Sequence, residues 1–360
     1  MYTRAELQQM QSRPWERQLM VAQAKVLEAL RDTNGDISVA FSGGKDSCLV
    51  ADLFADAVSH STYTNTVRLI FANTTIESHG ILEHIKLFRE YLSNKYGVNV
   101  EVVEVRPKIP WVAWCKKNGL PFISKAQAKA YRYIKADMYF TDTTADEVIS
   151  HAEQNTYNVK WLYERGFSRT GVLGITGFVY NRQEFGDMFR LAKKWRPLLY
   201  SDIMLTEQCC VNIKEKPLES ITGNVMTGEQ ANESEQRTQK YLKHGCNFKL
   251  ANGEYHSRPL GPMSKDAVLR SIVYRNIPIA SDYGDVVCGE CCYCSGAQRT
   301  GCVLCGFGIQ FDKYRFSRLV GTAEEVRLRY AFTSVEDGGL GYGRVIRFLN
   351  ENCGTDIIIP

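Results

Sequence analysis

A glycine-rich turn in the N-terminal part of the sequence carries residue types suited to binding phosphate. Residues 41–47 read Phe-Ser-Gly-Gly-Lys-Asp-Ser and stand between a predicted strand and a predicted helix. Glycine lets backbone amides approach an anion closely, and the start of a helix adds a favourable field. Lys45 adds positive charge, and Asp46 is suited to hold Mg²⁺ or to cap the helix. The turn therefore predicts a phosphate-binding loop formed by Ser42, Gly43, Gly44, Lys45, Asp46 and Ser47.

The sequence contains 12 cysteines, and the spacing of four of them is suited to metal binding. Because cytosolic reductants keep thiols reduced, a cysteine-rich cytosolic chain suggests metal ligation or redox chemistry rather than disulfides. Cys209 and Cys210 are adjacent, and Cys302 and Cys305 form a CxxC pair that begins 302 − 210 = 92 positions later. Two such pairs can supply four sulfur ligands, and the count alone suits zinc as well as an iron–sulfur cluster.

A third group of cysteines lies just before the CxxC pair. Cys288, Cys291 and Cys294 have the spacing CxxCxxC, which predicts a possible second metal site. One of these thiols could instead form a persulfide, given access and a lowered pKa. A flexible loop with incidental cysteines is the remaining interpretation.

The turn at 41–47 resembles the SGGxDS signature of the PP-loop ATP pyrophosphatases, which split ATP into AMP and pyrophosphate to adenylate a substrate. From about residue 36 to 320 the chain resembles the phosphoadenosine phosphosulfate (PAPS) and adenylyl-sulfate reductase-like family of that superfamily. The resemblance includes the two cysteine pairs, Val105-Arg106-Pro107-Lys108, and Ile277-Pro278-Ile279-Ala280. It implies an adenine nucleotide alpha hydrolase-like fold, ATP and Mg²⁺ as cofactors, and a [4Fe–4S] cluster rather than zinc on Cys209, Cys210, Cys302 and Cys305.

The same resemblance implies further residues of the nucleotide site. Residues 71–77 match a family segment that contacts the nucleotide, which implies roles for Asn73, Thr74 and Glu77. A plain helix cap by Thr74 or Thr75 is the structural alternative. Gln230 stands where an arginine is usual, so of the basic side chains for an anionic substrate only Arg237 carries over. The expected catalytic residues are Lys45, Asp46 and Arg237.

Two departures from the reductases indicate a different activity. The reductases end in a Glu-Cys-Gly-x-His tail whose cysteine is the nucleophile, whereas Cys353 here has no neighbouring histidine and is expected to be structural. Reductases have no need to split ATP, and their loop usually degenerates, whereas the intact loop here favours ATP cleavage. We therefore expect an enzyme that adenylates an acceptor and supports sulfur transfer of the nucleic-acid thiolation or phosphorothioation type.

The expected partners are a sulfur donor protein or a thioredoxin-like reductant, with DNA or RNA as a possible acceptor. Two alternatives stay open at this point. One is a true reductase that releases sulfite, and the other is a non-catalytic iron–sulfur module of a nucleic-acid modification complex.

The elements that must position these residues alternate between strand and helix. Alternation of this kind predicts an α/β fold with a doubly wound, mostly parallel sheet, with the loop at the rim where ligands usually bind. The elements are strands at 37–41, 66–72 and 98–105 and helices at 48–58 and 76–96. We expect an N-terminal helix (1–35), a nucleotide-binding domain (36–245) with a helical insertion near 110–195, a cysteine-rich cluster region (246–320) and a tail (321–360).

Composition sets broad limits on location and partners. The 360 residues are 44% hydrophobic and 23% charged, which is typical of a soluble globular protein. The net charge of +4 is too mild to predict a nucleic-acid binder by itself. The first residues show no signal-peptide pattern, and no stretch is long and apolar enough to span a bilayer. A cytoplasmic protein without a membrane partner is expected.

Overall fold

The computed structural model describes residues 1–153, 159–176, 178–179, 182–183, 190–219, 221, 223–310 and 312–360. Contacts divide the chain into two compact units, each built from two segments of sequence. Unit 1 contains Met1–Pro107 and Lys214–Cys302, and unit 2 contains Lys108–Ile213 and Val303–Pro360. These divisions differ from the predicted limits at 245 and 320, because the chain leaves unit 1 and returns to it.

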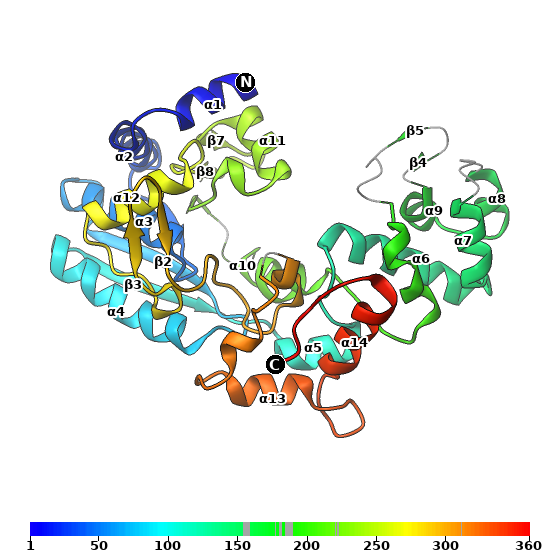
Figure 1. Cartoon of the computed structure of the whole chain (residues 1–360). Coiled ribbons are helices and arrows are strands. Elements are labelled where there is room, and N and C mark those ends of the chain that lie inside the picture. Colours follow the sequence, from blue (N-terminus) through cyan, green and yellow to red (C-terminus); the bar gives the residue numbers. More distant parts are fainter. Residues whose placement is uncertain are drawn as a thin grey trace. The chain divides into compact units, whose positions relative to one another are not determined.

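Unit 1 is an α/β unit organised around a six-stranded sheet (Figure 1). The strand order is β3-β2-β1-β6-β8-β7, and all neighbouring pairs are parallel except β7 with β8. The predicted class, α/β with a mostly parallel sheet, is confirmed. The strands are β1 (Ser38–Ala40), β2 (Thr66–Ala72), β3 (Asn99–Val105), β6 (Val225–Thr227), β7 (Asn247–Lys249) and β8 (Tyr255–Ser257).

Four helices share one apolar core with this sheet: α2 (Trp15–Asp32), α3 (Lys45–Ser59), α4 (His79–Tyr96) and α12 (Lys265–Tyr274). Ser264 caps α12, since its side chain accepts a hydrogen bond from the amide of Ala267. The prediction of a single N-terminal helix is wrong in detail. Two helices are present, α1 (Arg4–Gln11) and α2, because Pro14 disfavours helical backbone in the residue before it and becomes the cap of α2.

Three smaller elements of unit 1 lie in its second segment. The short helix α10 (Lys216–Glu219) precedes β6, and α11 (Glu235–His244) follows it. The strands β9 (Val286–Cys288) and β10 (Cys292–Cys294) form an antiparallel hairpin that contacts α12. The hairpin occupies the CxxCxxC segment.

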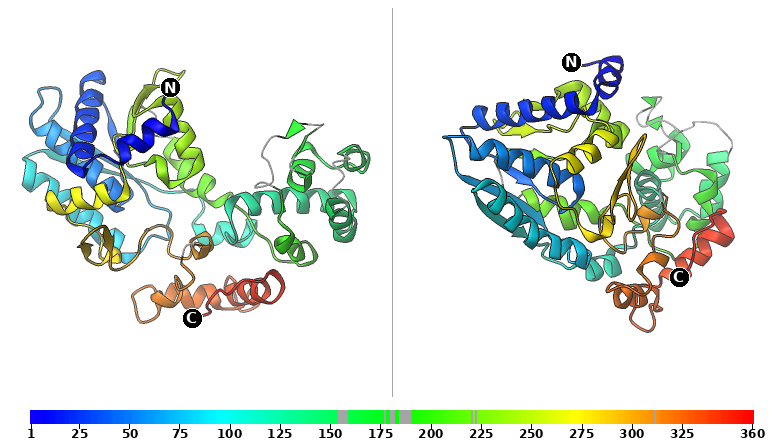
Figure 2. Two further views of the ribbon diagram at one scale, coloured as in Figure 1. Left: turned by 45° about the horizontal axis from the view of Figure 1, so that its top comes forward. Right: turned by 60° about the vertical axis from the view of Figure 1, so that its left-hand side comes forward.

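Unit 2 is mostly helical, as the sequence indicates for residues 110–195. Its helices are α5 (Trp111–Asn118), α6 (Lys125–Thr141), α7 (Ala145–Glu153), α8 (Val159–Glu164), α9 (Arg169–Thr176), α13 (Glu325–Phe332) and α14 (Tyr342–Cys353), with short strands β4 (Phe178–Val179) and β5 (Arg182–Gln183). The segment expected to be a tail thus forms two helices, seen at the red end of the chain in Figure 2. Tyr342 is fully buried and donates to the carbonyl of Leu304 at 2.7 Å, which anchors α14 within unit 2.

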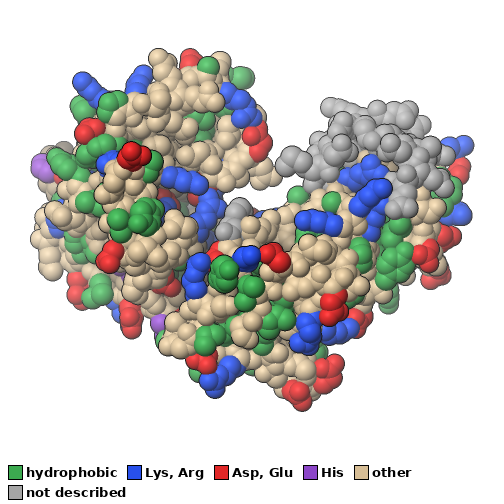
Figure 3. Space-filling model, in the orientation of Figure 1, with side chains coloured by type: hydrophobic (Ala, Val, Ile, Leu, Met, Phe, Trp, Pro, Cys, Tyr) green, Lys and Arg blue, Asp and Glu red, His purple; other side chains and the backbone are tan. Residues whose placement is uncertain are grey.

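The surface gives little guidance on a macromolecular partner. On the face shown in Figure 3, Lys and Arg side chains occur in several groups interspersed with Asp and Glu. Trp111 and Trp114 are buried, so these two aromatic rings serve packing in unit 2. Within the described residues, the helices are all too short or too polar to cross a membrane.

Candidate functional site

The phosphate loop links the end of β1 to the start of α3. Gly44 is the cap residue of α3, and Gly43 has a φ of 70°, a backbone conformation that favours glycine. The hydroxyl of Ser47 donates to the carbonyl of Gly44 at 2.8 Å, and the amide of Ser42 donates to that hydroxyl at 3.2 Å. These bonds close the loop on itself. Asp46 lies inside the first turn, so its alternative role as the helix cap is wrong.

The loop opens on a cavity of about 460 Å³ in unit 1, a size within the usual range of ligand sites. The ends of β1, β2 and β6 contribute to its lining, as expected for the carboxyl ends of parallel strands. Thr227 lines it with a buried hydroxyl that has no hydrogen-bond partner in the described part of the chain. Predicted residues that line the cavity are Ser42, Gly44, Lys45, Asp46, Ser47, Thr74, Glu77, Arg237 and Cys302.

The residues after β2 that the resemblance assigns to the nucleotide do not all line the cavity. Thr74 donates to Glu77 at 2.8 Å, and both line the cavity. Asn73 does not line it: its amide donates to Glu104 of β3 at 2.8 Å, beside a different cavity. The alternative of a helix cap by Thr74 or Thr75 is wrong, since α4 begins later and is capped by Ser78.

Charges of both signs meet around the cavity. Lys45 Nζ lies 2.8 Å from both carboxylate oxygens of Asp46, and Gln230 Nε2 donates to the same carboxylate at 3.0 Å. Gln230 therefore orients Asp46 and contributes no charge. Arg237 forms an ion pair with Glu233, and burial lowers the pKa of Arg237. A pocket with fixed cations and carboxylates suits a phosphate ligand that arrives with a metal cation.

Some cavity residues were not identified as nucleotide contacts from the sequence. The hydroxyl of Tyr283 accepts a hydrogen bond from the amide of Lys45 at 3.3 Å and lies 2.9 Å from Thr300 Oγ1. Burial raises the pKa of Tyr283, so it remains protonated at neutral pH. Lys214 and Arg299 add two further basic side chains to the lining. Tyr283 is 238 positions from Lys45, and no local pattern in the sequence links the two.

Two uncharged side chains, Cys48 and His84, lie beneath the phosphate loop. Cys48 Sγ lies 3.2 Å from His84 Nε2, and both side chains are buried between α3 and α4. Burial lowers the pKa of His84 to about 4 and raises that of Cys48 well above its usual value. Both groups are therefore uncharged at neutral pH.

Three of the four proposed cluster cysteines interact in unit 2. The hydrogen bond with Cys210 and burial raise the pKa of Cys209, and the charge of Cys305 adds to the effect. Burial alone would lower the pKa of Lys125, but the charges of Cys210, Cys305 and Cys209, with a hydrogen bond to Cys210, raise it. Lys125 was not identified from the sequence, because its contact with Cys210 is long-range.

Cys302 contacts Thr74 of unit 1. Its sulfur lies 3.5 Å from Thr74 Oγ1, at the lining of the nucleotide cavity. Cys305 follows three positions later and belongs to unit 2. Thiolates are the ligands that iron–sulfur clusters and zinc prefer, so the donor set of Cys209, Cys210 and Cys305 fits either group chemically. Among the described residues, no three His, Cys, Asp or Glu side chains are already arranged to hold a metal ion.

The CxxCxxC segment does not present three thiols. Cys288 forms a disulfide with Cys292, its cross-strand partner in the β9–β10 hairpin. Cys291 is exposed in the turn, and Cys294 is buried. The expectation of metal ligation rather than disulfides is thus wrong at Cys288, because the hairpin places Cys288 directly opposite Cys292. With Cys288 oxidised, the three-cysteine metal site lacks one of its ligands.

Cys353 ends α14 and is 3% exposed. Burial raises its pKa to about 11. A buried, protonated thiol is a poor nucleophile, in agreement with a structural role.

Comparisons with known proteins give limited information. No protein-family model matches the chain, and no curated protein matches it. Among solved structures, the chain is similar to the phosphoadenylyl-sulfate (PAPS) reductase from Candida auris, determined as a phosphate complex. The identity is 10%, the match covers 71% of this chain and 82% of that chain, and the TM-score is 0.33. At this score the likeness supports no residue-level inference, and the fold assignment rests on the strand order of unit 1.

Proposed function

We propose that the chain binds ATP at the phosphate-loop cavity and cleaves it to AMP and pyrophosphate, and thereby adenylates an acceptor. The observation that carries this proposal is the loop at 42–47, which lies between β1 and α3 and lines a cavity with basic side chains. Helix N-termini preceded by glycine-rich turns bind phosphate through their amides. The unpartnered hydroxyl of Thr227 in the same lining supports a polar ligand there.

In the proposed reaction an acceptor oxygen attacks the α-phosphorus, the bond to the bridging oxygen breaks, and pyrophosphate leaves. Lys45 and the amides at the start of α3 stabilise the negative charge on the phosphates. Arg237 and Arg299 line the same cavity and can bind the phosphates or an anionic acceptor. Catalysis then comes mainly from positioning and charge stabilisation.

Asp46 is the residue that would hold Mg²⁺, whose charge offsets that of the phosphates when it is bound. Its carboxylate is already oriented by Lys45 and Gln230. Ser42 and Ser47, whose hydroxyls lie 3.3 Å apart, can donate to phosphate oxygens once they exchange their mutual contact for the ligand.

The proposed sulfur step uses the four cysteines that the sequence predicts as cluster ligands. We propose that Cys209, Cys210, Cys302 and Cys305 hold a [4Fe–4S] cluster, which would supply a route for sulfur to the adenylated acceptor. Two residues separate Cys302 from Cys305, so the covalent chain keeps these two thiols near each other. Cys302 also lines the nucleotide cavity, which supports sulfur chemistry beside the nucleotide. Lys125 offsets negative charge on the thiolates.

Pyrophosphate release is the test of adenylation. Purified protein with reconstituted iron, incubated with ATP, Mg²⁺ and candidate acceptors, is expected to release pyrophosphate. Lys45→Ala should lower that rate by about 10²–10³-fold. Lys249→Ala, at an exposed position of β7, is the matched control and should retain the rate. The adenylation proposal fails if no acceptor, DNA and RNA included, supports pyrophosphate release.

The main alternative, a reductase that releases sulfite, needs a reactive thiol. Cys353 is the candidate from the sequence, and its burial and raised pKa favour the adenylation proposal instead. Sulfite release from a sulfonucleotide with thioredoxin, lost in Cys353→Ser, would support the reductase. ATP binding without turnover, with salt-dependent affinity for DNA or RNA, would support a non-catalytic module.

A further inference from the structure

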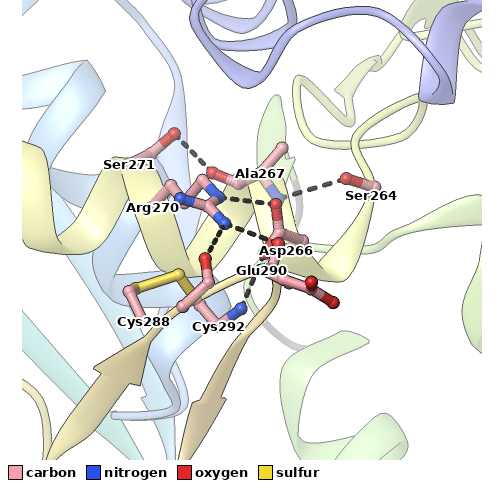
Figure 4. Close-up of a disulfide and its surroundings, with 9 residues drawn as sticks. Ser264, Asp266, Ala267, Arg270, Ser271, Cys288, Glu290 and Cys292 are labelled. Carbon is pink, nitrogen blue, oxygen red and sulfur yellow. Dashed lines mark hydrogen bonds and ion pairs between the residues drawn. A yellow bond between two sulfur atoms is a disulfide. The ribbon is translucent and has the colours of Figure 1, made fainter.

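We propose that the Cys288–Cys292 disulfide is a thiol–disulfide exchange site at which a small dithiol protein delivers two electrons. The disulfide joins the two strands of the β9–β10 hairpin next to the turn Gly289-Glu290-Cys291 (Figure 4). This inference identifies a point of attack for the thioredoxin-like reductant that the sequence leads us to expect, and it does not require ATP cleavage.

The two cysteines of the disulfide differ in exposure. Cys288 is exposed, whereas Cys292 is 9% exposed and packs with the core of unit 1. Exchange requires a thiolate to approach one sulfur in line with the disulfide bond, so access decides which sulfur is attacked. Cys288 is therefore the sulfur that accepts the incoming thiolate, and Cys292 is the leaving group.

The hairpin is held in place by contacts that do not involve the disulfide. Arg270 of α12 donates to the carbonyls of Gly289 at 2.8 Å and Glu290 at 2.9 Å (Figure 4). Asp266 accepts from the amide of Cys292 at 2.7 Å and also binds Arg270. A disulfide that closes so short a loop restricts the unfolded chain little. The reduced hairpin should therefore keep its two thiols opposite each other.

The hairpin continues into the wall of the nucleotide cavity. Beyond β9 and β10, the amide of Ser295 donates to Asp285 and that of Gly296 to Tyr283, at 2.9 and 2.8 Å. The hydroxyl of Tyr283 in turn accepts from Lys45, and Gln298 donates to the carbonyl of Cys294 at 2.7 Å. Electrons delivered at Cys288 thus arrive on the segment that leads to the cavity-lining Cys302.

The reaction balances without a further reactant. One thiolate of the partner attacks Cys288, which forms a mixed disulfide and releases Cys292 as a thiolate that takes up a proton. The second thiol of the partner then attacks the mixed disulfide and releases Cys288. The products are two thiols in this chain and one disulfide in the partner, so the partner is oxidised by two electrons.

Trapping with a mutant dithiol protein tests the site. The probe is thioredoxin whose resolving cysteine is replaced by serine, added to the full chain purified without reductant. We expect a mixed disulfide mapped to Cys288 by peptide mass. Cys288→Ser should not be trapped, whereas Cys291→Ser, which removes the neighbouring exposed thiol, should be trapped as well as the wild type. Intact thioredoxin should reduce the disulfide at least about tenfold faster than an equal concentration of a monothiol.

Three results would overturn the proposal. They are alkylation of both Cys288 and Cys292 before any reduction, a mixed disulfide mapped to another cysteine, or thioredoxin reducing no faster than the monothiol. Pyrophosphate release and trapping, both measured on the wild-type chain, separate this proposal from the proposed function. Retained release with failed trapping of the wild type rejects the exchange site alone, whereas trapping at Cys288 without pyrophosphate release rejects adenylation alone.

Discussion

The phosphate-loop cavity and the thiol group of Cys209, Cys210 and Cys305 are built in different ways. The cavity takes its residues from strand ends and helix starts, and backbone hydrogen bonds fix the loop before any ligand binds. The thiol group depends on side-chain contacts, including the hydrogen bond between Lys125 and Cys210. The first is a preformed cavity, whereas the second should gain order from a ligand. Preorganisation reduces the cost of binding, so we expect ATP to bind without the cluster.

The largest expected effect is on the thiol group. Cys210→Ser should lose most of its iron after reconstitution, because three thiolates and a hydroxyl hold a cluster poorly. ATP affinity should remain within about twofold of the wild-type value, which is equivalent to less than 0.5 kcal/mol. Iron analysis and calorimetric ATP titration on the same sample measure both. Cys353→Ser, at a buried thiol outside the group, should keep its iron, and equal iron in both variants would contradict the ligand assignment.

The next effect concerns the preformed cavity. A Cβ at Gly228 would lie 2.8 Å from the carbonyl carbon of Asp46 and 3.0 Å from the amide of Ser47. Gly228→Ala should therefore displace the start of α3 and weaken ATP binding by about 100-fold. Gly289→Ala, where a Cβ meets nothing within 4 Å, is the matched control. The iron content of Gly228→Ala should not change. Loss of both ATP binding and iron would show that the cavity and the thiol group are coupled.

A third effect concerns the stability of the fold and comes from His84, which pairs with Cys48 beneath the phosphate loop. His84 has a pKa of about 4 in the folded chain and 6.5 when unfolded, so the unfolded state binds the proton more readily. Stability from this residue is complete above pH 6.5 and is lost as pH falls toward 4. Between pH 7 and pH 5 the loss is about 2 kcal/mol. Urea unfolding should show this loss in the wild type and in His60→Gln, and a loss smaller by about 2 kcal/mol in His84→Gln.

The smallest effect is expected from reducing the hairpin disulfide. Because Arg270 and Asp266 hold the turn independently, ATP affinity should change by about threefold or less, equivalent to roughly 0.6 kcal/mol. Titration of ATP into oxidised and reduced protein measures the change. A large difference would mean that the hairpin acts as a switch on the cavity rather than as an entry point for electrons.

Local sequence patterns were sufficient to predict much of the secondary structure of unit 1. β2 occupies the predicted residues, and Ser264 begins α12, because strand periodicity and caps are set by neighbouring residues. The loop at 42–47 was predictable for the same reason. The predicted beginning of α4 was wrong by three residues, since Ser78, rather than Thr74 or Thr75, caps this helix.

Contacts between distant residues account for what the sequence did not reveal. The Tyr283–Lys45 and Lys125–Cys210 contacts join residues with no common pattern. Asn73 binds Glu104 because β3 lies next to β2, a pairing that fixes its direction away from the cavity. The disulfide follows from the register of β9 and β10.

The position of β1 between β2 and β6 has a consequence for synthesis on the ribosome. One edge of β1 can pair as soon as β2 emerges, but its other edge waits for β6, which begins 225 − 40 = 185 positions after β1 ends. At about 5–20 residues per second, that edge stays unpaired for roughly 9–37 s. An open strand edge is a template for wrong pairing. The growing chain should therefore depend on chaperones until Val225 is made, and slower translation of the first segment of unit 2 should lower the yield of folded protein.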